Sequence, residues 1–389
     1  MHSEYRTLNP NSLNTTLQKK IWLSSPHMGG LEQEYVQQAF DTNWIAPLGP
    51  NVTGFEEDIS HYIGKDIHVT ALSSGTAAIH LGLVLLGVEQ GDEVLCQSFT
   101  FSASANPIQY LGAEPVFVDS EPDTWNLSPE LLEEAIIDRL KYGKKPKAII
   151  AVHLYGMPYK VEQIIAIAKK YDIPVLEDSA EALGSSYRDI KCGSFGDIAV
   201  LSFNGNKIIT TSGGGALLSK NKDFTKKALF LSTQARDNAI HYQHSEIGFN
   251  YRMSNVLAGI GRGQIRVLED RVEARRNNYC IYRSELGNLD AVSFLNEPEG
   301  MYSNRWLSCI LTPSFTIREK IRNALMAENI ESRPLWKPMH LQPVFSNKNA
   351  FLNGVSEDLF NKGLCLPSGS NLSNDDLERT TNIIKRNLR

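Results

Sequence analysis

The sequence lacks several features that mark common functional classes. Its cysteines are odd in number and include no CxxC pair, which indicates neither a zinc site nor a disulfide framework; they are Cys96, Cys192, Cys280, Cys309 and Cys365. It has no block of basic residues, and its formal net charge is −5, so we expect no nucleic acid as a partner. Apolar runs such as 81–88 are far shorter than the roughly 20 residues that span a bilayer, so we expect no membrane partner.

Two further absences concern targeting and dinucleotide binding. The start of the chain, MHSEYRTLNPNSLNTT, is polar and carries no apolar signal core, so we expect a cytoplasmic protein. No GxGxxG pattern follows the first expected strand, and the run at 213–215 lacks the strand-to-helix context of that pattern. This disfavours a nicotinamide-binding enzyme.

The composition is that of an ordinary globular enzyme. The chain has 389 residues, of which 42% are hydrophobic and 21% are charged. This length predicts two or three structural units and a core large enough to be stable without disulfides.

Short β-rich runs alternate with helical patterns through the first two thirds of the chain. Ser128 is the expected N-cap of one intervening helix, with Pro129 at its first position. The alternation predicts an α/β fold in which helices cover both faces of a mostly parallel sheet. We expect strands at 67–72, 93–97, 115–119, 147–154, 173–178, 197–203 and 215–219.

A long helical pattern over about 254–286 follows the last of these strands. It leads to a smaller C-terminal α+β unit. The sequence therefore predicts an N-terminal arm (1–25), a large domain (26–286) and a small C-terminal domain (287–389).

Ligands of parallel sheets bind at the carboxyl ends of strands, and four sequence features fall there. The first is Ser73-Ser74-Gly75-Thr76, which follows a strand and opens an apolar helix. Free backbone amides at a helix start, with a glycine that permits close approach, make a seat for an anion. The alternative is a simple N-cap with a tight turn.

The second feature is Glu177-Asp178, at the end of the expected strand 173–178. Acids at strand ends are often only turn residues. The functional interpretation is that Asp178 pairs with the pyridine nitrogen of pyridoxal phosphate and keeps that ring protonated.

The third feature is Lys207, one turn after the strand that ends near Ser202. A loop lysine is usually solvated, but this position suits an amine held in a pocket for Schiff-base chemistry. Ser202 could reach a phosphate group. The fourth feature is the stretch 97–101, where an aromatic residue could stack on a flat ring, although core packing is the commoner role.

Taken in order, four segments resemble motifs of the DegT-like (DnrJ/StrS-type) sugar aminotransferases, and the resemblance runs over roughly 21–367. The segments are SSGTAAIHLGL, EDSAEALGS, LSFNGNKIITTSGGG and EIGFNYRMSN. The resemblance implies the aspartate-aminotransferase type of fold (fold type I), pyridoxal phosphate as cofactor, and a homodimer.

The resemblance also implies roles for individual residues. Lys207 would carry the cofactor as a Schiff base and move the proton, and Asp178 would hold the pyridine nitrogen. Glu181, where many relatives have glutamine, would lie near the ring hydroxyl. The full cofactor set is Ser74, Gly75, Thr76 and Ser202 at the phosphate, Phe101 on the ring, Asp178, Glu181, Lys207, and Asn250 reaching the partner subunit's site.

Two terminal segments narrow the resemblance further. SSPHMGGLEQEYVQQAFDTNWIAPLGPNV and SRPLWKPMHLQPVF are similar to enzymes that aminate UDP-2-acetamido-2,6-dideoxy-4-keto-hexoses in the bacillosamine branch of bacterial polysaccharide biosynthesis. This similarity implies amination at C4 and a set of substrate-binding residues, while the family resemblance implies L-glutamate as the amino donor. These are His27, Met28, Gly29 and Gly30, with Lys337, Pro338, Met339 and His340; a packed histidine beside prolines is the alternative for His340.

Several alternatives stay open at this point. Sugar 3-dehydratases of the same family carry histidine at the position of Lys207, so the lysine argues against them. The substrate could be a different keto-sugar, aminated at C3 or linked to dTDP. A catalytically silent regulatory relative is disfavoured by the Lys207–Asp178 pair. A cysteine desulfurase would share the cofactor fold, but no cysteine sits in a recognisable catalytic segment.

Overall fold

A computed structural model describes residues 19–388 of the chain, and residues 1–18, most of the predicted arm and the polar start, lie outside it. Its centre is an eight-stranded sheet with the order β1-β9-β8-β5-β4-β2-β3-β14. The strands are β1 (His68–Leu72), β2 (Glu93–Gln97), β3 (Glu114–Val118), β4 (Ala148–Val152), β5 (Val175–Asp178), β8 (Ile198–Ser202), β9 (Gly215–Ser219) and β14 (Ala350–Phe351).

Strand directions confirm the predicted mostly parallel sheet. All pairs from β8 to β14 are parallel, whereas β9 runs antiparallel to both β1 and β8. All seven expected strands are present, and each of their ends lies within two residues of the prediction.

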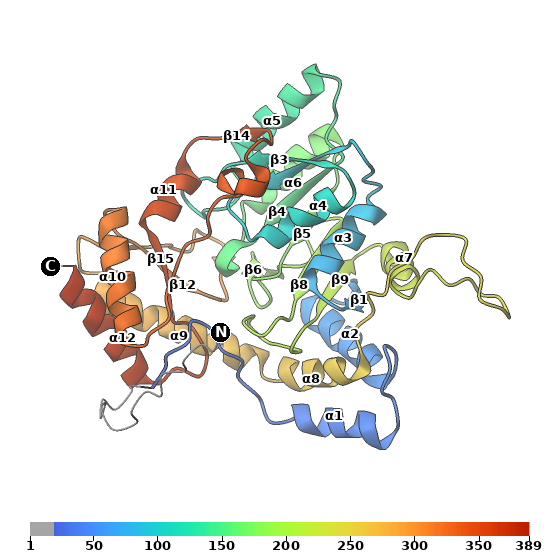
Figure 1. The fold of residues 1–389 in the computed structure, drawn as a ribbon, viewed down its shortest axis with the longest axis horizontal. Coiled ribbons are helices and arrows are strands. Elements are labelled where there is room, and N and C mark those ends of the chain that lie inside the picture. Colours follow the sequence, from blue (N-terminus) through green and yellow to red (C-terminus); the bar gives the residue numbers. More distant parts are fainter. Residues whose placement is uncertain (1–18, 389) are drawn as a thin grey trace, which may run out of the picture.

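Helices cover both faces of this sheet (Figure 1). Side chains of neighbouring strand residues point to opposite faces, so Cys96 packs in the core beneath α3 (Gly75–Leu85) while Leu95 packs against α5 (Pro129–Lys141) and α6 (Val161–Tyr171). Ser128 caps α5 as expected, accepting a hydrogen bond from the Leu131 amide. The remaining helices of the large unit are α1 (Glu32–Asp41), α2 (Pro50–Ile63), α4 (Asn106–Tyr110), α7 (Lys222–Ser232) and α8 (Asn255–Ile265).

The predicted helical stretch 254–286 is two helices. α8 ends at Ile265, Val267 has a non-helical backbone, and α9 (Leu268–Leu286) then runs toward the C-terminal part of the chain (Figure 1). This part contains an antiparallel sheet of order β10-β12-β15-β13. Its elements are β10 (Ser293–Phe294), β12 (Ser308–Leu311), α10 (Phe315–Ala327), β13 (Arg333–Pro334), α11 (Val355–Lys362), β15 (Gly363–Leu366) and α12 (Asn374–Asn387).

Two segments pack across the predicted domain boundaries. The boundaries themselves stay a prediction. Ile21 forms a β-bridge with Ile330 and packs in the core of the C-terminal part. In the other direction, β14 pairs with β3 of the large sheet. A small third sheet also joins the two parts through β6 (Ser186–Tyr187), β7 (Ile190–Lys191) and β11 (Met301–Tyr302).

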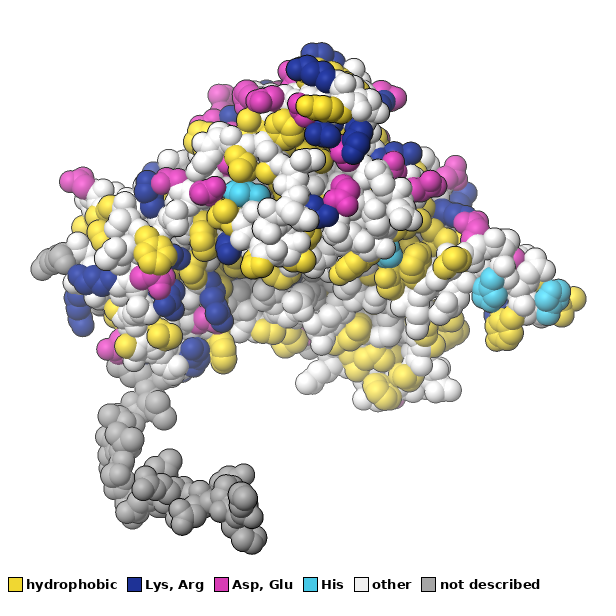
Figure 2. Space-filling view, turned by 45° about the horizontal axis from the view of Figure 1, so that its top comes forward, with side chains coloured by type: hydrophobic (Ala, Val, Ile, Leu, Met, Phe, Trp, Pro, Cys, Tyr) yellow, Lys and Arg dark blue, Asp and Glu magenta, His cyan; other side chains and the backbone are white. Residues whose placement is uncertain are grey.

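The segment that follows α7 projects from the body of the molecule (Figures 1 and 2). Its side chains Ile240, Tyr242 and Ile247 are 105%, 78% and 88% exposed. We call residues 236–250 the projecting arm. Among the helices that the structure describes, none has the length and apolar character needed to cross a membrane.

Candidate active site

A cavity of ≈ 330 Å³ opens at the carboxyl ends of β5 and β8, beside the start of α3. It lies where ligands of α/β sheets bind. The cavity brings together all but one of the predicted cofactor residues, namely Ser74, Gly75, Thr76, Phe101, Asp178, Glu181, Ser202 and Lys207.

The start of α3 forms one wall of the cavity. Ser74 has an extended backbone, and its hydroxyl accepts a hydrogen bond of 3.0 Å from the Ala77 amide. A Cβ atom on Gly75 would lie 3.0 Å from Cβ of Ser202, so a larger residue would crowd Ser202 and glycine favours the close approach of this helix to β8. The helix start and the Ser202 hydroxyl together provide a seat for an anion.

Asp178 lies in the same cavity and is 4% exposed. Its Oδ2 accepts a hydrogen bond of 2.7 Å from the Ser104 hydroxyl, and its Oδ1 accepts one of 3.1 Å from the Ala180 amide. Within residues 19–388, no Lys, Arg or His side chain forms an ion pair with it at 4.0 Å or less. A buried carboxylate is costly without a positive partner, so this position suits a ligand that carries one.

Lys207 reaches the cavity from the loop after β8, and its side chain is 12% exposed. Its Nζ lies 3.6 Å from Oε1 of Glu181 and 4.4 Å from the centroid of the Trp306 ring. Burial raises the pKa of Glu181, and the nearby charge of Lys207 opposes that rise. The lysine is therefore a pocket residue and not a solvated loop residue.

Aromatic side chains from distant parts of the chain surround the outer cavity. Phe101 is 57% exposed, and its ring centroid lies 6.3 Å from that of Trp336. Trp336 in turn lies 5.5 Å from Tyr155 and 6.4 Å from Trp306. An exposed aromatic at a cavity mouth can stack on a flat ligand.

Thr100, Ser104 and Trp306 are among the residues that line this cavity and to which the sequence analysis assigned no role of their own. The two hydroxyl residues carried a usable signal, because both lie within seven residues of the end of β2 and flank Phe101. Trp306 carried none, since it belongs to the C-terminal part and is far from every motif.

The His27–Gly30 segment does not line the cavity in the same chain. His27 Nδ1 lies 3.0 Å from the Ser370 hydroxyl, and the amides of Gly29 and Gly30 donate to the Glu32 carboxylate at 2.6 and 2.7 Å. Met28 is 49% exposed. The segment thus wraps the start of α1, and a substrate-binding role for it stays a prediction.

The Lys337–His340 segment follows Trp336 and also lies outside the cavity lining. Met339 is buried, and its amide donates to the carbonyl of Ser98. His340 Nδ1 lies 2.7 Å from the Ser98 hydroxyl, while its Nε2 lies 3.2 Å from Glu357. Both ring nitrogens therefore have partners within the chain, Pro338 is buried, and Lys337 is half-buried.

Asn250 is the one predicted cofactor residue outside the cavity. It is exposed at the base of the projecting arm, where it forms a bridge with Thr233. This position is compatible with a role in another subunit, which the resemblance implies.

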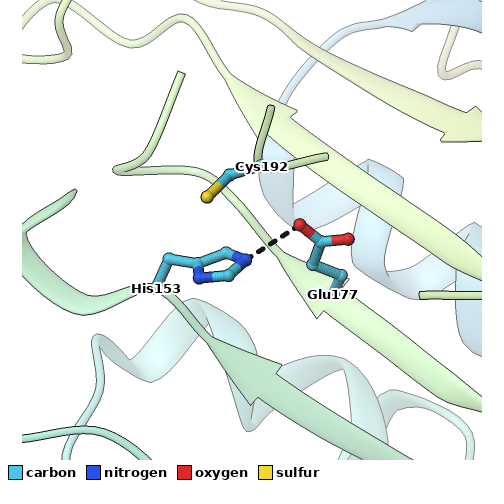
Figure 3. A group of neighbouring side chains, drawn as sticks. All are labelled: His153, Glu177 and Cys192. Atoms are coloured by element: carbon cyan, nitrogen blue, oxygen red, sulfur yellow. Dashed lines mark hydrogen bonds and ion pairs between the residues drawn. The ribbon is translucent and has the colours of Figure 1, made fainter. Parts of the chain in front are cut away.

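Next to Asp178, the side chains of His153, Glu177 and Cys192 form a buried cluster with ligand-type atoms within 4.8 Å of one another (Figure 3). Its contacts are those of a hydrogen-bonded anchor and not of a metal site. Nδ1 of His153 accepts from the Tyr159 amide, so Nε2 is left to donate to Glu177 at 2.8 Å. Burial raises the pKa of Cys192 and keeps it a thiol, whereas metals bind thiolates.

Glu177 is the centre of this anchor. Its carboxylate accepts hydrogen bonds from the Ser179 hydroxyl and from the amides of Gly193, Phe195 and Gly196 in the turn before β8. Burial alone would raise the pKa of Glu177, but these bonds and that of His153 outweigh it and lower the pKa. The anchor joins this turn to β5, the strand that carries Asp178.

Pyridoxal phosphate, the cofactor that the resemblance implies, fits these residues. The start of α3 with Ser202 suits the phosphate, and the buried Asp178 suits a protonated ring nitrogen. Lys207 supplies the amine, and Phe101 an aromatic face at the mouth.

Comparisons with known proteins agree with this fit. The model of the DegT/DnrJ/EryC1/StrS aminotransferase family matches residues 26–385. EpsN of Bacillus subtilis (strain 168), whose name describes a pyridoxal phosphate-dependent aminotransferase, is 51% identical over 95% of this chain and 96% of its own. The GDP-perosamine synthase of Escherichia coli O157:H7 is 38% identical over 92% of this chain and 96% of its own.

A solved structure is similar in both sequence and backbone. It is a DegT DnrJ EryC1 StrS aminotransferase from Brucella abortus, with a TM-score of 0.85 and 31% identity over 91% of this chain and 94% of that chain. This likeness confirms the predicted fold type I.

Proposed function

Because the chain belongs to the DegT/DnrJ/EryC1/StrS aminotransferase family, we propose that it aminates the C4 keto group of a UDP-2-acetamido-2,6-dideoxy-4-keto-hexose. At the coarser level, the protein is a pyridoxal phosphate-dependent sugar aminotransferase. The proposed amino donor is L-glutamate. The observation that carries the proposal is the meeting of Lys207 with the buried Asp178, which has no ion-pair partner within residues 19–388, in one cavity.

Each residue of the cavity has a proposed function that follows from its position. Bound pyridoxal phosphate supplies an electron sink for the carbon that gains or loses the amine. Asp178, oriented by Ser104, keeps the ring nitrogen protonated, while the start of α3 and Ser202 bind the phosphate. Lys207 holds the cofactor and moves the proton at the reacting carbon, since its amine is a buried group beside the cavity.

The sugar specificity rests on the similarity of the two terminal segments to the bacillosamine branch. The diphosphate of the substrate needs cationic partners outside the cofactor cavity, and Lys337 and Arg333 are the proposed ones. Arg333 is exposed and pairs with Glu331 at 2.9 Å, a contact that a phosphate group could replace. Pro334 and Pro338 restrict the freedom of the segment that carries these charges.

A GDP-linked 4-keto-sugar is the second candidate substrate. The similarity to a GDP-perosamine synthase favours it, because the name of that relative specifies a GDP-linked sugar. The two sequences align over 92% of this chain.

A substrate panel distinguishes these candidates. Purified protein, L-glutamate and 4-keto-sugars linked to UDP, GDP or dTDP are incubated, and products are identified by mass spectrometry and NMR. The proposal predicts turnover with the UDP-linked acetamido sugar and a new amine at C4. Turnover only with a GDP-sugar, or an amine at C3, would overturn the substrate assignment and leave the aminotransferase assignment intact.

We also propose a homodimer in which Asn250 serves the partner's site. Support comes from the projecting arm, whose apolar side chains Ile240, Tyr242 and Ile247 are largely exposed (Figure 2). Such side chains on an extended arm suggest burial against a second copy of the chain.

A further inference from the structure

Trp306 is a cavity residue to which neither the motifs nor the resemblance gives a role. It is 1% exposed, and the Nζ atom of Lys207 lies over its ring at 4.4 Å from the centroid. An ammonium group within about 6 Å of a tryptophan face is attracted by the ring, and more strongly when water is excluded. The contact is therefore a specific one between the C-terminal part and the proposed cofactor lysine.

Glu181 contacts the same amine from the loop after β5. Its Oε1 lies 3.6 Å from Nζ, and its Oε2 accepts a hydrogen bond of 2.7 Å from the Tyr155 amide. The carboxyl group is thus fixed in place and free to face the lysine with its other oxygen. The Lys207 amine thus contacts a carboxyl group and an aromatic face.

Hydrogen bonds hold Trp306 in register with the lysine loop. Its indole Nε1 donates to the carbonyl of Asn206, the residue before Lys207, at 2.8 Å. Its backbone amide donates to Asn304 Oδ1 at 2.8 Å, and its carbonyl accepts from Arg275 at 2.6 Å. A tryptophan that only filled space would not need a hydrogen bond from its indole to the backbone of Asn206. This bond therefore indicates that the position of the Trp306 ring relative to Lys207 matters.

We infer that Glu181 and Trp306 form a holding site for the ammonium group of Lys207 whenever this lysine is not joined to the cofactor. The inference rests on the proposed role of Lys207. With the cofactor in its amine form, Lys207 would be free. The holding site would then keep this amine at the cavity, ready to accept and return a proton.

The two forms of the cofactor provide the test, because only the aldehyde form uses the lysine. Lys207 would leave the holding site to join bound pyridoxal phosphate, and it would stay there when pyridoxamine phosphate is bound. Loss of the ring in Trp306→Leu should therefore favour the aldehyde form. Full-length protein is equilibrated with mixtures of the two forms, and the bound ratio is measured by absorbance and mass spectrometry.

The ratio Kd(pyridoxamine phosphate)/Kd(pyridoxal phosphate) should rise about threefold to thirtyfold in Trp306→Leu, the range expected for a desolvated cation–π contact. Trp306→Phe keeps an aromatic face and should show a smaller rise. Glu181→Gln, which removes the charge, should shift the ratio in the same direction as Trp306→Leu.

A matched control uses the Lys207→Ala background, in which Trp306→Leu should leave the ratio unchanged. Equal weakening of both forms in Trp306→Leu would show that the tryptophan only packs, and this would overturn the inference. If Lys207→Ala by itself did not alter the ratio, the proposed role of Lys207 would be wrong, which is a separate outcome.

Discussion

Two hydroxyl groups control the surroundings of Asp178. The oxygens of Thr100 and Ser104 lie 2.8 Å apart, and Ser104 donates to Asp178 at 2.7 Å. Hydrogen bonds to a charged group are stronger than neutral ones, and a second hydroxyl behind the donor strengthens them further. Ser104 is therefore a positioning residue that aims the carboxylate into the cavity.

Removal of this hydroxyl should weaken cofactor binding. We expect Ser104→Ala to raise the Kd for pyridoxal phosphate by roughly tenfold, because one charge-assisted hydrogen bond of about 1.5 kcal/mol is lost. Spectroscopic titration of the cofactor-free protein measures this value. Ser104→Thr, which keeps the hydroxyl, is the control. An unchanged Kd in Ser104→Ala would show that Asp178 is held without this bond.

For individual residues, the sequence predicted the location of those site residues whose positions depend on the adjoining strand. Asp178 ends the buried strand β5 and Lys207 lies five residues after β8, so their place at the carboxyl edge of the sheet followed from the strand pattern. The contact between Lys207 and Trp306 could not be predicted, because no periodicity links the two segments and only the folded chain joins them.

Among the elements, β5 positions two buried carboxylates, because it ends in Glu177 and Asp178. Glu177 faces five donors from His153, Ser179, Gly193, Phe195 and Gly196, and these hold the end of the strand against the turn before β8. The sequence analysis assigned no role to Glu177, because three of its five donors are backbone amides of a turn distant in the sequence. Any residue type except proline could have provided those amides.

Glu177→Gln should destabilise the protein. The amide offers only one acceptor oxygen and turns an N–H toward buried donors, at a cost of about 3 kcal/mol. Urea unfolding at pH 7 measures the change in the free energy of unfolding. Glu133→Gln, at the partly exposed ion pair between Glu133 on α5 and Lys170 on α6, is the matched control and should have little effect.

The same variant has a pH signature. Folding lowers the pKa of Glu177 below its ordinary value of 4.5, so its ionised form adds stability above that pH and loses this contribution as the pH falls. The stability difference between wild type and Glu177→Gln should therefore shrink below pH 4.5. A difference independent of pH would contradict an ionised Glu177 in the folded protein.

Element boundaries differed in how well they could be predicted. Strands were clear because buried parallel strands read as short apolar runs. The break between α8 and α9 was not, because 266–267 contains neither proline nor glycine. The break separates two packing environments. α8 packs beside α1 and α2, whereas α9 packs against α12 and β12 of the C-terminal part (Figure 1).

For the whole molecule, the proposed dimer places two chains at each site. The projecting arm carries exposed apolar side chains, and Asn250 at its base lies outside the cavity of its own chain. In a symmetric dimer, a residue that serves the neighbouring site does so twice.

Mixed dimers test this arrangement. Lys207→Ala and Asn250→Ala proteins, each inactive alone, are mixed and allowed to exchange subunits. If Asn250 acts in the partner's site, half of the dimers are mixed and one of their two sites is intact, which gives about a quarter of the wild-type activity. No recovery after verified exchange would place the function of Asn250 in its own chain.

The identity of the cofactor lysine decides the central claim most directly. Protein loaded with pyridoxal phosphate is treated with borohydride and digested, and the reduced adduct is located by peptide mapping. We predict that the adduct lies on Lys207, and that Lys207→Ala still binds the cofactor through Ser202, Thr76 and Asp178 but forms no adduct and completes no transamination. An adduct on any other lysine would contradict the assignment of this cavity as the active site.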